Sequence, residues 1–207
     1  MMQQPDGTPT AQVLLNAFGA DKNTSVRYQV ATLSRVTSLL FSELDSLTEE
    51  LSRAKFTDDS FQPIVTAFER LSVAGLANQW QNSKQFFHTS SILLRAFGEG
   101  LPEDGAPISK DDLTNLQNTI VELRDEVRES DLPGRVKIFV YEQIETIARA
   151  IHDYPLAGVK ALRAAVRDVV FREAEHMEVV ESYLSTPVMT RLKTVIQKLG
   201  ELSKYVI

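Results

Sequence analysis

The chain has 207 residues, of which 43% are hydrophobic, with a net charge of -6 and no cysteine. This length and hydrophobic content can bury a core without cross-links, and the lack of cysteine excludes disulfides, thiolate metal sites and thiol nucleophiles. The acidic balance disfavours general attraction to nucleic acid or anionic lipid, and the sequence has neither a secretory signal pattern nor a membrane-spanning window, so we expect a cytoplasmic protein without membrane contact.

Hydrophobic residues repeat every three or four positions along nearly the whole chain, which predicts an all-α bundle of about eight helices in antiparallel hairpins. A short apolar turn stops at Gly19, and residues 21–25 can cap a long helix over residues 25–54. Because the flanks of its apolar seam lack the charged pairs of an exposed coiled coil, we expect that seam to be buried in the bundle. The seam positions alternate by four and three residues: Val26, Val30, Leu33, Thr37, Leu40, Leu44, Leu47 and Leu51.

Two further helices are predicted before the middle of the chain, one after the predicted N-cap Thr57 and one ending near Phe97. The helical pattern weakens between them, around residues 75–81. Trp80, the only tryptophan, lies in that weak stretch. Aromatic side chains are enriched at the centres of interfaces, so we predict Trp80 as an exposed anchor for a partner, the alternative being a core side chain.

A linker is predicted at residues 98–109, GEGLPEDGAPIS, because glycines, prolines and acids are combined there. It separates an N-terminal helical half, residues 1–97, from a C-terminal half, residues 110–207. The pattern leaves open whether the two halves share one core. Ser109 and Asp112 resemble a capping box at the start of the next helix.

A hairpin is predicted after the turn at residues 131–134: a helix that Pro155 ends, a corner at Gly158 where backbones can approach closely, and a basic helix over about residues 156–172. Its positions include Leu132, Pro133, Val136, Val140, Ile144, Ala150, Ile151, Asp153, Tyr154, Leu156, Gly158 and Leu162. This segment, roughly residues 132–162, resembles uncharacterised helical proteins of bacterial mobile-element and defence-type loci. The resemblance implies a bacterial context and carries no activity or site residue.

The last helix begins at Thr186 and Pro187 and carries another apolar seam, Val188, Leu192, Val195, Leu199, Leu202 and Val206. Its place at the chain end predicts that the seam docks onto another chain, with rim contacts from Arg191, Lys193, Lys198 and Lys204. The leading hypothesis is therefore a non-enzymatic interaction or assembly module, an accessory or regulatory subunit whose partner is another protein or a second copy.

A nucleic-acid-binding regulator is the first alternative. Lys160, Arg163 and Arg167 are spaced by three and four residues and form a basic stripe on the predicted helix. Ion pairs with neighbouring acidic helices, or a solvated face, account for the stripe equally well.

A metal-dependent enzyme is the second alternative. Glu173 and His176 place a carboxylate and an imidazole on one helix face, as in carboxylate-bridged di-metal bundles, but His88 and His152 lack the matching glutamate of a second pair. Such a pair is also common on any charged helix. We find no catalytic motif, and we predict no cofactor or metal.

Overall fold

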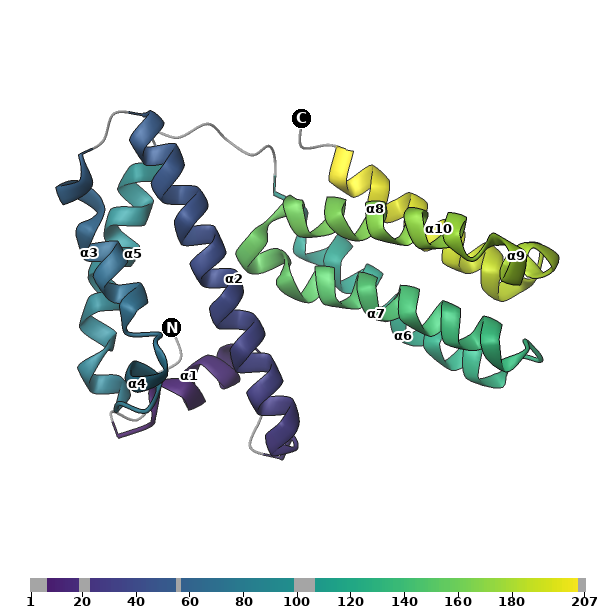
Figure 1. Cartoon of the computed structure of the whole chain (residues 1–207), viewed down its shortest axis with the longest axis horizontal. Helices are drawn as coiled ribbons and strands as arrows, with labels where there is room; N and C mark the ends of the chain where they lie inside the picture. The colour runs from purple at the N-terminus through teal and green to yellow at the C-terminus, as the bar shows by residue number, and fades with distance from the viewer. Residues whose placement is uncertain (1–6, 19–22, 55–56, 99–106, 205–207) are drawn as a thin grey trace. The chain divides into compact units, whose positions relative to one another are not determined.

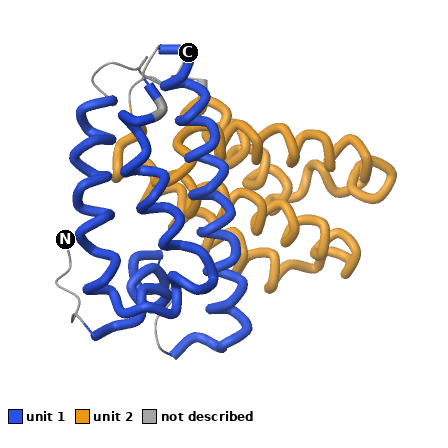
Figure 2. Tube along the Cα trace, turned by 60° about the vertical axis from the view of Figure 1, so that its left-hand side comes forward, with its two compact units in different colours: residues 1–102 blue, residues 103–207 orange. Residues whose placement is uncertain are grey.

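The computed structural model describes residues 7–18, 23–54, 57–98 and 107–204 (Figure 1). Over these residues it has ten α-helices, two short 3₁₀ helices and no strand beyond one isolated bridge, which confirms the all-α prediction. The two helices α4 and α9, of four residues each, were not predicted from the sequence. The chain divides into two compact units, residues 1–102 and 103–207, coloured separately in Figure 2. The division lies within the segment of linker composition, of which residues 99–106 lie outside the described part.

Unit 1 contains the first five α-helices. The longest, α2, is capped by Ser25, whose hydroxyl accepts a hydrogen bond from the Tyr28 N–H at 3.3 Å, as the sequence predicts. Thr57 is the N-cap residue of α3, without a side-chain capping bond. The helices are α1 (Thr10–Ala17), α2 (Val26–Arg53), α3 (Asp58–Glu69), α4 (Val73–Leu76) and α5 (Lys84–Gly98), with a 3₁₀ turn at Trp80–Asn82.

The core of unit 1 forms where the C-terminal half of α2 meets α3 and α5. Its buried members are Leu44, Leu51, Phe61, Ile64 and Phe97. The predicted seam of α2 is therefore core at its C-terminal end. In the N-terminal half the prediction is wrong, because Val26 and Val30 are exposed. Thr32 and Val36, on another side of the helix, are the buried residues there.

Trp80 belongs to a junction between the start of the chain and the segment before α5. The backbone N–H of Trp80 donates to the Thr8 carbonyl at 2.7 Å, and the backbone N–H of Thr10 donates to the Asn78 carbonyl at 2.9 Å. The indole ring is half-buried and stacks on the Phe87 ring, with centroids 5.5 Å apart. Trp80 is therefore only partly exposed and supports the structure of unit 1, while its role as an anchor for a partner stays a prediction.

Unit 2 is a four-helix bundle. Each long helix packs on two neighbours, because α6 and α8 both contact α7 and both contact α10. This closed arrangement buries a continuous core of mostly aliphatic side chains along all four helices. The elements are α6 (Lys110–Glu129), α7 (Gly134–Ala157), α8 (Val159–Glu175), α9 (Met177–Val180), a 3₁₀ turn at Glu181–Tyr183, and α10 (Pro187–Lys204).

The ends of α6 and α7 show which local signals hold. The Ser109 hydroxyl accepts from the Asp112 N–H at 3.0 Å, so the predicted cap of α6 is confirmed. Pro155 does not end α7, which continues through it to Ala157. Gly158 ends the helix with φ of 57° and ψ of -150°, a conformation that is essentially restricted to glycine. The predicted close backbone approach at Gly158 is wrong, since an added Cβ would meet nothing within 4 Å.

Candidate interaction surface

The apolar seam of α10 lies in the core of unit 2, not on its surface. Leu202 is half-buried against this core, and Val206 lies outside the described residues. These side chains pack with α6 and α8 and cannot meet a partner without opening the bundle, so their predicted role in partner binding is corrected. The fully buried seam residues are Val188, Leu192, Val195 and Leu199.

The cations predicted to form a rim on α10 are partly engaged within unit 2. Arg191 forms ion pairs with both Glu122 and Glu126 of α6. Lys193 Nζ lies 3.9 Å from a carboxylate oxygen of Glu173 on α8. These pairs tie α10 to the neighbouring helices α6 and α8 within unit 2.

The basic stripe of α8 is exposed, as its spacing indicates, and Arg163 and Arg167 also have partners within unit 2. Lys160, Arg163 and Arg167 all lie on the outer face of α8. Arg163 Nε donates to the Ser203 carbonyl near the end of α10 at 3.1 Å. Arg167 Nε lies 3.5 Å from a carboxylate oxygen of Asp168. The stripe therefore contributes to helix packing as well as to surface charge.

An exposed apolar set follows this stripe along the chain, and sequence reasoning missed it. Val169 enters the core, whereas Val170 is 53% exposed and Phe171 is 63% exposed. In the sequence the triplet Val169 to Phe171 looks like core. The signal was the period: Leu162, Ala165 and Val169 already complete the buried face of α8, so the next two positions fall outside it.

The same segment continues through α9 with further exposed apolar and acidic side chains. Met177 and Val179 are exposed, as are the three glutamates of residues 174–186, a stretch that contains no lysine or arginine. We call this set the α8–α9 surface. It consists of Val170, Phe171, Met177 and Val179 with Glu175, Glu178 and Glu181.

The residues considered for a metal have other contacts. Glu173 is near Lys193, and His176 Nδ1 lies 3.0 Å from the Arg172 carbonyl oxygen. The His176 ring also packs on Phe139, with centroids 5.6 Å apart. Within the described ranges, the structure brings together no group of three or more metal-ligating side chains.

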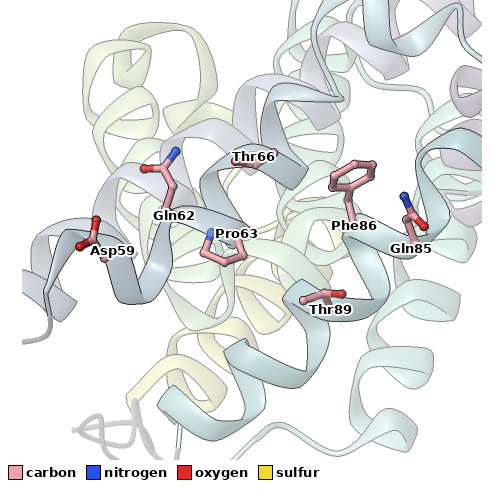
Figure 3. A pocket seen from close by; sticks show the side chains of 7 residues that line it. All are labelled: Asp59, Gln62, Pro63, Thr66, Gln85, Phe86 and Thr89. Atoms are coloured by element: carbon pink, nitrogen blue, oxygen red, sulfur yellow. The ribbon is translucent and has the colours of Figure 1, made fainter.

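An open groove of about 650 Å³ runs between α3 and α5 in unit 1 (Figure 3). Asp59 is the single titratable side chain in its lining, so the groove offers no acid–base pair. The Phe86 ring borders the groove, and the Arg70 guanidinium lies over this ring, 4.4 Å from its centroid. The other lining residues are Gln62, Pro63, Thr66, Gln85 and Thr89.

Comparisons of the chain with protein-family models, with curated proteins and with solved structures gave no match. Among the described helices, none combines the length and apolar character needed to cross a membrane.

Proposed function

We propose that the chain is a non-enzymatic, cytoplasmic helical module that binds another protein through the α8–α9 surface, as an accessory or regulatory subunit of a bacterial system. The exposure of Phe171 carries this proposal. Burying a side chain of this size contributes about 1.5–3 kcal/mol, so leaving it in water forgoes that stabilisation in the isolated chain. Val170, the residue before it, is also exposed.

The shape of the surface favours a macromolecule over a small ligand. The outer face of a helix is convex, whereas small molecules bind in concave sites that enclose most of their area. Apolar side chains surrounded by charged ones are instead typical of protein interfaces, where an aromatic centre lies within a polar rim. Phe171 fits the centre of such a patch, and Glu175, one turn farther along α8, fits its rim.

Site-specific photocrosslinking in cells tests this proposal. We expect a photoreactive side chain at position 171 to crosslink a defined protein, and the same group at position 121 to give no such product. Val121 is a matched control because it is 56% exposed on α6 of the same unit. Equal products at both positions, or none at position 171, would contradict the proposal.

A second candidate function is binding of single-stranded nucleic acid along α8, because an exposed aromatic follows a basic stripe on one helix. Lys160, Arg163 and Arg167 would contact phosphates, and Phe171 would stack on a base. This candidate predicts oligonucleotide binding that weakens steeply with salt and is lost in Arg167→Glu. Absence of binding at low salt would eliminate it.

A further inference from the structure

The N-terminal half of α2 is a second exposed apolar surface, and its charge is opposite to that of the three glutamates of the α8–α9 surface. Val26 is 75% exposed and Val30 is 60% exposed, one turn apart on the same face. Arg27 is exposed between them. Residues 26–42 contain two arginines and no acid, and the first turn of α2 has no acidic residue to offset the positive end of the helix dipole. We call Val26, Arg27 and Val30 the α2 surface.

We propose that the α2 surface of one copy docks onto the α8–α9 surface of a second copy. The proposal rests on the proposed function, because it uses the same α8–α9 surface and names its partner. Valines of α2 would cover Phe171 and its apolar neighbours, while Arg27 and the helix N-terminus would face the glutamates. Complementary charges of this kind favour association and fix its orientation.

Charge also argues against symmetric pairing of either surface with itself. Two α2 surfaces in contact would bring two positive helix ends and two copies of Arg27 together. Two α8–α9 surfaces in contact would bring two sets of three glutamates together. Like charges facing each other oppose association, so pairing of unlike surfaces is favoured. A contact between two different surfaces is heterologous, and its repetition forms a ring or an open chain of copies.

The association is weak and depends on salt. The α2 surface exposes two apolar side chains and the α8–α9 surface exposes four. A standard stable interface is larger, with roughly 20–30 residues and about 800 Å² buried on each partner. The charges are solvent-exposed, so salt at physiological concentration screens them over roughly 8 Å. We therefore expect self-association of the full chain that grows with protein concentration and decreases as salt is added.

Mixing two full-length variants tests the head-to-tail arrangement. Val30→Glu disables the α2 surface, and Phe171→Glu disables the α8–α9 surface. Each variant alone should associate at least about tenfold more weakly than the wild type, since a central apolar contact is lost. A 1:1 mixture should restore association but stop at a heterodimer, because one intact surface of each kind remains. Light scattering and sedimentation velocity measure these masses.

Matched controls separate the surfaces from general effects of an added charge. Val73→Glu in unit 1 and Val121→Glu in unit 2 alter exposed valines, 89% and 56% exposed, outside both surfaces, and should keep wild-type association. Circular dichroism should show unchanged helicity in all four variants. In a second test, Arg27→Glu should weaken association, and mixing it with Glu178→Arg should restore it.

A mixture of the Val30→Glu and Phe171→Glu variants that stays monomeric would overturn the proposal, and so would a wild-type chain that is monomeric at several hundred micromolar in low salt. The self-assembly can fail while the proposed function holds. If the wild-type chain is monomeric and position 171 still crosslinks a different protein, the proposed function holds and the self-assembly is wrong.

Discussion

Replacing Gln143 with methionine should stabilise unit 2. Gln143 lies on α7 between core positions Val140 and Ile147 and is fully buried. Neither its amide nitrogen nor its amide oxygen has a hydrogen-bond partner among the described residues. A buried polar group without a partner costs about 1–3 kcal/mol, and methionine offers a similar length without polar demands. Allowing for imperfect packing, we expect a gain of about 2 kcal/mol, on the lower side of the cost of two such atoms.

The assay can follow each unit separately. Trp80 is the only tryptophan and lies in unit 1, so its fluorescence reports unfolding of that unit. Hydrogen exchange of α7 peptides reports unit 2. In Gln143→Met, exchange of α7 should slow by roughly 30-fold, the equivalent of about 2 kcal/mol, while the Trp80 transition stays at its wild-type denaturant concentration. Gln117→Leu on the exposed face of α6 is the control and should change neither signal.

Faster exchange of α7 in Gln143→Met would refute this reasoning. That result would mean that the amide contributes favourable hydrogen bonds in solution, as a buried water bound to it would provide. A matching shift of the Trp80 transition would refute the assumption that the two units unfold separately.

Four further outcomes are expected. Gly158→Ala should destabilise unit 2 by roughly 1–3 kcal/mol because of the positive φ, whereas Gly200→Ala inside α10 should stabilise it by about 1 kcal/mol, both measured by thermal denaturation. Gly75→Ala should lower the denaturation midpoint seen by tryptophan fluorescence, since the new Cβ would lie 2.1 Å from the Arg70 carbonyl oxygen. Arg191→Met should cost about 1 kcal/mol at low salt and less at high salt, without changing self-association, as paired denaturation and light-scattering measurements would show.

Local signals in the sequence predicted most helices and their starts, because caps depend on neighbouring residues alone. Ser25 and Ser109 are N-caps as predicted. Pro155 misled because a proline inside a helix removes a backbone hydrogen bond and usually ends the helix, whereas α7 continues for two more residues, to Ala157. Gly158 is a corner, as predicted. The predicted reason was a close approach of two backbones, but the reason in the structure is its positive φ. The short helices α4 and α9 are single turns, too short to show a period.

The regular spacing of an apolar seam does not predict whether the seam lies in the core or at an interface, because both have the same spacing. The α10 seam is regular and is covered by α6 and α8 of the same unit. The α2 seam is equally regular, yet α2 has 28 residues and α3 only 12. At about 1.5 Å per residue, α2 is longer than α3 by roughly 24 Å. Val26 and Val30 lie in the part of α2 that α3 is too short to cover. Unequal predicted helix lengths were therefore the signal for an uncovered seam, and the charges beside it favour the acidic partner surface that we propose for it.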